Sequence, residues 1–264
     1  MKRADTQLAR AGSGMRDHAT EFLLDAEAMA IEDTIWWARG RRSIIRAFLN
    51  RAAKGTIDGI LEIGCGSGGD LATLACYGKV WGIERSAALA NRARQRGAAV
   101  DVYETDFFDK EIGLGFNLFC LFDVLEHIED DDRFVSRVAT ATTRDHMLLI
   151  SVPACQFLFG PHDEILHHYR RYSRRRIEAL LEKHDYEIVH SSYFMFLLFP
   201  IAVLSRCLEG LKRRLGHKKK EVNIGRVPGP INWIFTKALQ FEAWLGRFVR
   251  FPIGLWVFVL ARKK

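Results

Sequence analysis

The chain has 264 residues, of which 48% are apolar, so a sizeable core is expected and wholesale disorder is excluded. Its 39 lysines and arginines against 32 acidic residues give a net charge of +7, which favours an anionic partner such as nucleic acid, a phospholipid surface or a phosphorylated substrate. Five dispersed cysteines without a C-x-x-C pair indicate reduced thiols and a cytoplasmic protein. No secretory signal is expected, and no apolar run reaches the ~20 residues that span a bilayer.

The N-terminal part of the chain has a helical pattern. Apolar residues recur every three or four positions from Glu21 to Ala53, which defines a helical cap over residues 1–55. The cap contains the tract W-W-A-R-G-R-R at residues 36–42. Adjacent tryptophans cannot share one helix face, so one is expected to pack inward while the other borders a pocket.

Strand and helix patterns then alternate. We predict helices at about Leu71–Tyr77, Ser86–Arg96, Asp131–Thr142 and Ser173–His184. The predicted strands are Gly59–Ile63, Val80–Glu84, Val100–Tyr103, Phe116–Phe122, Met147–Val152 and Tyr186–Tyr193. Such alternation is typical of an α/β protein whose parallel sheet is covered on both faces, and it predicts a core over residues 56–193.

The pattern changes after Tyr193. Residues 194–215 and 231–249 are predicted helices around a loop rich in lysine, glycine and proline, and together they form an insertion over residues 194–251. Residues 252–264 are predicted to supply a final buried core strand.

A glycine-rich turn follows the first predicted strand. Ile60, Leu61 and Ile63 lead into the sequence G-C-G-S-G-G-D at residues 64–70. Glycine accepts a positive φ and lets a ligand approach the backbone, and the next helix can present free N–H groups. The spacing also satisfies the dinucleotide pattern, and Glu84, about twenty residues further on, suits ribose hydroxyls. A nicotinamide cofactor and S-adenosylmethionine both remain open at this point.

The ends of the third and fourth strands distinguish between these cofactors. They read E-T-D-F at residues 104–107 and F-D-V-L-E-H-I at residues 122–128. With E-I-G-C-G-S-G and G-I-E-R-S, these motifs make residues 60–128 resemble the class I S-adenosylmethionine-dependent methyltransferases. The resemblance implies a Rossmann-like, seven-stranded sheet with helices on both faces, in which the last strand inserts antiparallel.

The resemblance also implies a cofactor site. The glycines would approach the methionine part, Glu84 the ribose, and Asp106 with Phe107 the adenine. The fourth strand would line the methionyl side. The complete expected set is Glu62, Gly64, Gly66, Gly68, Glu84, Arg85, Asp106, Phe107, Phe122, Asp123 and Leu125.

The fourth motif raises the question of a metal. Asp123, Glu126 and His127 have a D-x-x-E-H spacing, and carboxylate and imidazole groups at helical spacing can hold a divalent ion. In the family that this chain resembles, E-H at this position is ordinary in members without a metal. We therefore interpret the acidic run after it as a solvated helix start and expect no metal.

The long segment after the fifth strand is the expected acceptor loop, residues 153–172. Ligands of open α/β sheets bind beyond the carboxyl ends of the strands. Its H-D-E…H-x-R-R-Y pattern, together with W-W-x-x-G-R-R, resembles a type 11/12-like subgroup of bacterial methyltransferases. We predict His162 or His168 as a base, Arg171 and Tyr172 as acceptor-orienting groups, and Trp37 and Arg41 as substrate contacts. The alternative is that these loop residues cap the following helix and pin the loop.

The insertion carries much of the net charge. Seven cations stand against one acid, Glu209, across residues 206–220. The cations are Arg206, Lys212, Arg213, Arg214, Lys218, Lys219 and Lys220. Apolar aromatic surface beside such a cluster favours contact with an anionic membrane at its inner face. Internal packing, a homodimer contact and RNA binding are the alternatives, with nucleic acid the least favoured.

These patterns predict S-adenosylmethionine-dependent methyl transfer to a small-molecule or lipid-like acceptor. Two other functions stay open: an NAD(P)-dependent oxidoreductase, and a non-catalytic peripheral membrane protein that keeps a nucleotide-binding fold.

Overall fold

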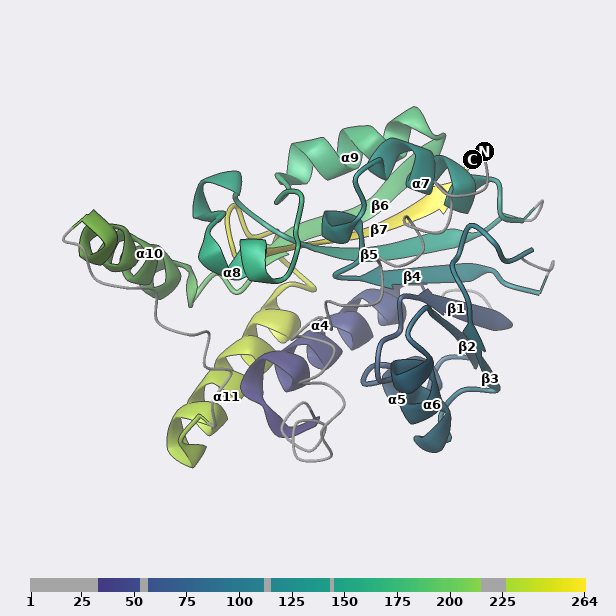
Figure 1. Ribbon diagram of the computed structural model, residues 1–264, viewed down its shortest axis with the longest axis horizontal. Coiled ribbons are helices and arrows are strands. Elements are labelled where there is room, and N and C mark those ends of the chain that lie inside the picture. Colours follow the sequence, from purple (N-terminus) through teal and green to yellow (C-terminus); the bar gives the residue numbers. More distant parts are fainter. Residues whose placement is uncertain (1–32, 53–56, 112–114, 143–144, 215–226) are drawn as a thin grey trace, which may run out of the picture.

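The computed structural model describes residues 33–52, 57–111, 115–142, 145–214 and 227–264, with side chains described to residue 208 in the fourth range. A seven-stranded sheet runs through the molecule in the order β3-β2-β1-β4-β5-β7-β6 (Figure 1). The strands are β1 (Gly59–Ile63), β2 (Lys79–Glu84), β3 (Asp101–Glu104), β4 (Leu118–Phe122), β5 (Met147–Pro153), β6 (Tyr186–Phe194) and β7 (Trp256–Lys263). The expected seven-stranded sheet is confirmed.

Strand β7 lies antiparallel between β5 and β6, whereas β1 to β5 pair parallel. The predicted antiparallel insertion of the last strand is therefore also confirmed. All five residues of both β1 and β4 are buried, which is the pattern of a parallel sheet covered on both faces.

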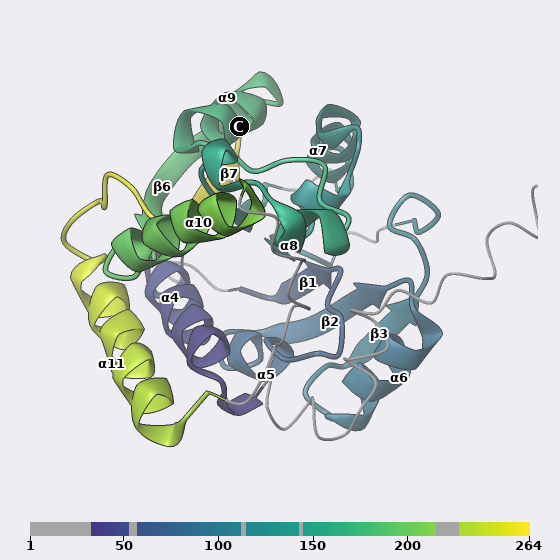
Figure 2. The same ribbon diagram turned by 60° about the vertical axis from the view of Figure 1, so that its left-hand side comes forward.

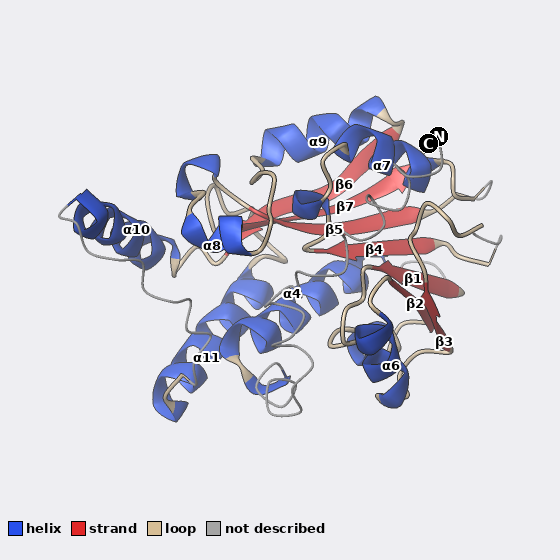
Figure 3. Ribbon diagram, viewed as in Figure 1, coloured by secondary structure: helices blue, strands red, loops and turns tan. Residues whose placement is uncertain are grey.

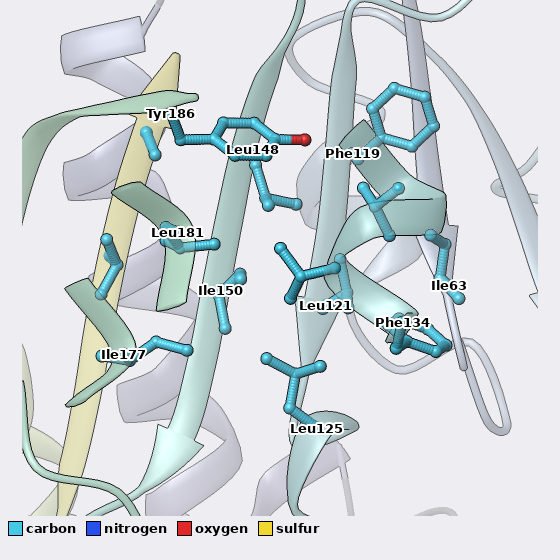
Figure 4. Packing of buried hydrophobic residues seen from close by; sticks show 14 of the residues in the cluster. Ile63, Phe119, Leu121, Leu125, Phe134, Leu148, Ile150, Ile177, Leu181 and Tyr186 are labelled. Atoms are coloured by element: carbon cyan, nitrogen blue, oxygen red, sulfur yellow. The ribbon is translucent and has the colours of Figure 1, made fainter. Parts of the chain in front are cut away.

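Helices cover the two faces of the sheet. The helices on one face are α7 (Asp131–Ala139) and α9 (Arg174–Lys183), and those on the other include α4 (Trp36–Ala52), α5 (Leu71–Leu74), α6 (Ala87–Gln95) and α11 (Gly229–Leu245) (Figure 1). Figure 4 shows the first core, where Ile177 and Leu181 of α9 and Phe134 of α7 meet the apolar strand residues. A second core lies under α4, whose Ile44, Ile45, Phe48 and Leu49 are buried.

Three short elements lie beyond the carboxyl ends of β4 and β5 (Figure 3). They are the 3₁₀ helices η1 (Leu125–His127) and η2 (Gln156–Leu158), and helix α8 (Pro161–Ile165). Helix α10 (Phe199–Arg214) follows β6 and lies near α8, where a guanidinium nitrogen of Arg206 is 3.6 Å from Asp163 Oδ2. The acceptor loop and the insertion thus meet at this end of the sheet.

Helix α4 runs without a break through the tract that contains the paired tryptophans. A Cβ at Gly40 would lie 2.2 Å from Leu239 of α11, so only glycine lets the two helices approach this closely. Figure 2 shows α4 and α11 side by side. This part of the insertion therefore packs internally against the N-terminal cap. The predicted helical residues before Asp33 lie outside the described residues.

Candidate functional site

The glycine turn joins β1 to α5 at the carboxyl edge of the sheet. Gly64, Gly66 and Gly68 have φ values of +73°, +54° and +81°, a left-handed conformation that other residues rarely adopt. A Cβ on Gly66 would meet nothing within 4 Å, so the turn has open space over its centre. The sequence predicted this backbone from the glycine spacing alone.

Glu84, at the end of β2, ties this turn to the neighbouring strand. Its Oε2 accepts a hydrogen bond of 3.0 Å from the Gly66 N–H, and its Oε1 accepts one of 2.8 Å from the Ser86 N–H. Glu84, which is expected to bind the ribose, therefore lies beside the glycine turn, which is expected to hold the methionine part. Arg85 is largely exposed, and its guanidinium lies 3.7 Å from Asp106 Oδ2.

Glu62 and Cys65 lie beneath the turn. Glu62 is 3% exposed within β1. Cys65 is buried, and its sulfur packs where a Cβ on Gly82 would lie, at 2.6 Å. Burial, with added repulsion from Glu62 and Glu84, raises the pKa of the Cys65 thiol. The thiol stays neutral and supports the turn by packing.

The residues expected to contact the adenine, Asp106 and Phe107, differ in their exposure. Asp106 is half-buried, and its Oδ1 accepts a hydrogen bond of 2.9 Å from the Phe108 N–H. Phe107 is 3% exposed, and its ring packs against Phe134 with centroids 5.3 Å apart, so it supports the turn from the core. Phe108, which the sequence reading did not single out, is 37% exposed and offers the accessible aromatic face.

Asp123 follows β4 with φ +56° and gathers donors from three elements. Its Oδ2 accepts from Arg41 Nη1 at 2.9 Å, and its Oδ1 accepts from Trp256 Nε1 at 2.7 Å and Ser151 Oγ at 3.2 Å. The other guanidinium nitrogen of Arg41 lies 2.8 Å from Asp70, directly after the glycine turn. Arg41 thus links Asp70, which follows the glycine turn, to Asp123, which follows β4.

Trp37 lies close to Arg41, and two core residues lie close to Asp123 in the chain. Arg41 lies over the Trp37 ring at 5.2 Å, and both side chains line a small cleft with Asp123, Met195 and Trp256. Phe122 and Leu125, on either side of Asp123, are 5% and 0% exposed and lie in the core.

Asp163 is the centre of the acceptor loop. It is fully buried, and its Oδ1 accepts from Arg171 Nε at 2.7 Å and lies 3.1 Å from His168 Nδ1. Its Oδ2 accepts from Arg171 Nη2 at 3.1 Å and from the Gly160 N–H at 2.9 Å. Burial alone would raise the pKa of Asp163, but hydrogen bonds from His168 and Arg171 lower it well below its usual range. The sequence reading gave this residue no role.

Tyr172 and Arg171 are turned toward the protein. Tyr172 is fully buried, and its hydroxyl donates to Asp131 Oδ2 at 2.8 Å and lies 3.2 Å from the Leu125 carbonyl. Arg171 also donates to the Ala154 carbonyl at 3.2 Å. Because the Tyr172 hydroxyl is engaged at α7, it positions the loop rather than facing an acceptor. This matches the alternative in which the loop residues pin the loop.

Three side chains from the two motifs meet near the same end of the sheet. Glu126 and His127 belong to η1, and His168 belongs to the loop after α8. One potential ligand atom from each lies within 4.8 Å of the others, and the two imidazole centroids are 4.6 Å apart. Glu126 is 1% exposed, and burial, with added repulsion from Asp123, raises its pKa well above the usual value. The sequence could not show that His168 joins this pair.

The insertion leaves apolar side chains exposed. On α10 these are Ile201, Leu204 and Leu208, which are 58%, 60% and 48% exposed. The lysines at 218–220 lie outside the described residues, and the side chains at 212–214 are likewise not described. Within the described part of the chain, no helix has the length and apolarity needed to cross a membrane.

Comparisons with known proteins agree with this geometry. A family model described as a methyltransferase domain matches residues 37–191, which is more than half of the chain. Among solved structures, NodS, an N-methyltransferase from Bradyrhizobium japonicum solved with S-adenosylhomocysteine, is 18% identical with a TM-score of 0.54. That match covers 66% of this chain and 88% of NodS. No curated protein matches the sequence.

Two further solved structures share the fold. An S-adenosylmethionine-dependent methyltransferase from Mesorhizobium loti is 17% identical, with a TM-score of 0.50, and the match covers 81% of this chain and 95% of that one. Phosphoethanolamine N-methyltransferase 2 from Haemonchus contortus is 18% identical with a TM-score of 0.53. The match covers 83% of this chain but only 52% of the Haemonchus enzyme, so the chain spans about half the length of that relative. From the family match over more than half of its length, this chain belongs to the methyltransferase domain family.

Proposed function

We propose that the chain transfers the sulfonium methyl group of S-adenosylmethionine to a small-molecule or lipid-like acceptor held beneath residues 153–172. The observation that carries the donor assignment is the turn with positive φ at Gly64, Gly66 and Gly68, open over Gly66 and tied to Glu84. In this proposal the turn holds the methionine part and Glu84 the ribose hydroxyls. Asp106 accepts from the adenine amino group.

Methyl transfer is an in-line displacement. The acceptor lone pair forms the new bond to carbon while the sulfur–carbon bond breaks, and S-adenosylhomocysteine leaves as a neutral thioether. Because this leaving group is good, most of the rate enhancement comes from positioning the two reactants. In the proposal, Arg41 and Asp123 fix the strand ends that flank the donor, and Trp37 borders the acceptor.

A hydroxyl or ammonium acceptor also needs a base. Of the two predicted bases we favour His162, next to the buried Asp163. Burial lowers the pKa of His162, so its imidazole is neutral and able to accept a proton at pH 7. His168 has its Nδ1 committed to Asp163.

An apolar surface supports a lipid-like acceptor. Phe157 of the acceptor loop is 67% exposed and packs edge-on against Phe199 at the start of α10, with centroids 6.3 Å apart. The surface continues along Ile201, Leu204 and Leu208 of that helix. With the basic residues that follow, we propose that this surface contacts an anionic membrane and receives the acceptor there.

Calorimetric titration tests the donor assignment. We expect S-adenosylmethionine and S-adenosylhomocysteine to bind and NAD to give no heat. Replacing Glu84 by glutamine removes a charged acceptor and should weaken donor binding about tenfold or more. Binding of NAD without binding of S-adenosylmethionine would support the oxidoreductase instead.

Co-sedimentation with vesicles tests the membrane surface. Binding to phosphatidylglycerol vesicles, but not to phosphatidylcholine vesicles, is expected, and the substitutions Ile201→Ser and Leu204→Ser together should abolish it. Val100→Ser removes an equally exposed apolar side chain beside β3 and serves as the control, since Val100 is 61% exposed. No sedimentation with either vesicle would refute membrane contact, and a dimer that dissociates in the double variant would assign the surface to self-association.

A further inference from the structure

Against the expectation from the sequence, we propose that Glu126, His127 and His168 bind a divalent transition-metal ion. The three residues come from two segments about forty positions apart, and one ligand atom from each lies within 4.8 Å of the others. Ligand atoms around a four-coordinate ion at about 2.1 Å stand roughly 3.4 Å apart. Small side-chain rotations would therefore close the site around an ion.

Glu126 provides the strongest indication of a missing ligand. Its carboxyl group is 1% exposed, and its Oε2 has no hydrogen-bond partner among the described residues. A buried carboxylate oxygen without a partner is unfavourable, because it has left water without a replacement contact. A cation between Glu126 and the two imidazoles would supply that contact.

His168 has the carboxylate partner on one ring nitrogen that metal-binding histidines usually have. Its Nδ1 lies 3.1 Å from Asp163 Oδ1, so that Nδ1–H donates to the carboxylate and the lone pair is on Nε2. Asp163 is itself held by Arg171 and by the Gly160 N–H. The carboxylate therefore fixes both the tautomer and the direction of the ring, which is the usual supporting arrangement around a metal ion.

The types of side chain in the site indicate which metal ions it would bind. Two imidazoles and one carboxylate suit Zn²⁺, Mn²⁺ or Fe²⁺, whereas Mg²⁺ and Ca²⁺ favour all-oxygen sites. His127 is exposed, so one side of the site faces solvent and leaves positions for a ligand from outside the protein.

The site suggests the class of acceptor, an inference that rests on the proposed methyl transfer. Asp123 lies three residues before Glu126 and lines the cleft with Trp37 and Arg41, so the ion would lie close to the expected donor pocket. An ion there would bind an acceptor hydroxyl and favour loss of its proton to a base. The oxygen lone pair then forms the bond to the methyl carbon as the sulfur–carbon bond breaks. This favours an O-methyl product.

Metal binding is tested on the full chain after dialysis against a chelator. Titration with Zn²⁺ should show one equivalent bound, and Mg²⁺ should bind at least 100-fold more weakly. Glu126→Gln and His168→Asn should each weaken Zn²⁺ binding 100-fold or more. His167→Asn, the same substitution at the exposed neighbouring histidine, should leave it unchanged; asparagine tolerates the positive φ of 57° at that position.

Co²⁺ gives a readout that does not depend on a variant folding. The wild-type chain should show visible absorption bands typical of a cobalt site with nitrogen ligands. Absence of these bands, or Zn²⁺ binding that survives both Glu126→Gln and His168→Asn, would overturn the site. S-adenosylmethionine titrated into the metal-free chain separates the proposals, because donor binding without metal binding refutes only the metal site.

Discussion

The proposed donor half of the site, around the glycine turn, and the proposed acceptor half, around Asp163, are built by different means. Around the glycine turn, backbone groups do most of the work, with positive φ at Gly66 and an N–H donated to Glu84. Around Asp163, His168 and Arg171 from the loop after α8 and Arg206 from α10 converge on one buried carboxylate. A site made of backbone groups can be recognised from a short sequence motif. The side-chain network around Asp163 can be recognised only in the folded structure. A substitution in one half should therefore impair the function of that half and leave the other half intact.

The largest effect is expected at Asp163. Asp163→Asn leaves Arg171 without its anionic partner in a buried site, and breaking such pairs lowers the free energy of unfolding by about 3–5 kcal/mol. Urea unfolding should show this loss, and methyl transfer should fall sharply while S-adenosylmethionine still binds. Glu164→Gln, at the exposed neighbour, is the matched control. Equal loss of donor binding would show that the two halves are one unit.

A group outside both halves gives a pH test of the core. Burial, with repulsion from Arg51 and Arg250, lowers the pKa of His190 to about 4. The folded state binds fewer protons than the unfolded state between pH 6.5 and 4, so stability present above pH 6.5 is lost as the pH falls through this window. The loss should reach as much as about 3 kcal/mol near pH 4. His190→Gln should flatten this part of the profile, measured by urea unfolding at each pH; an unchanged slope would contradict the assignment.

A smaller effect is expected at the donor turn. Gly66→Ala forces a side chain into the left-handed region, which disfavours the native turn by about 1–2 kcal/mol. Donor affinity should fall about tenfold in calorimetry, and the acceptor network should be unaffected. Gly229→Ala is the control, because a Cβ there also meets nothing within 4 Å but its φ is not positive. Similar behaviour of both variants would remove the argument from backbone conformation.

The smallest effect belongs to the cap that follows Glu84. Ser86 Oγ accepts a long hydrogen bond of 3.4 Å from the Leu89 N–H at the start of α6. Ser86→Ala should lower the unfolding free energy by about 0.5–1 kcal/mol and leave donor affinity nearly unchanged, as thermal melting and calorimetry would show. A donor-affinity loss as large as that of Gly66→Ala would mean that the cap, rather than the turn, shapes the site.

The sequence predicted the sheet well because its signal is local. The bounds of β1 match the prediction, and the other strands shift by a few residues at most. Helix α5 is shorter than expected and ends at Leu74, before Gly78, where a Cβ would lie 2.3 Å from the Ile57 carbonyl oxygen. Close approach of this kind depends on a neighbouring segment, so no local pattern contains it.

The acceptor half was less accessible to prediction because its contacts form only when the loop after α8 folds back onto Asp163. His168 and Arg171 were singled out as reactive or orienting groups, but their shared partner Asp163 was not. One signal was available in the sequence. Pro161 is the first residue of α8 and Asp163 the third, and the Asp163 carboxylate accepts from the Gly160 N–H as in a capping box. The link from Arg41 to Asp123 spans 82 positions and has no such signal.

Hydrogen exchange with and without S-adenosylmethionine tests the central claim most directly, because it locates the donor on the chain. The account predicts slower exchange at residues 64–70, 84–86 and 106–108 when the donor is bound, and little change across α11. Unchanged exchange at the glycine turn, with protection elsewhere or nowhere, would contradict it.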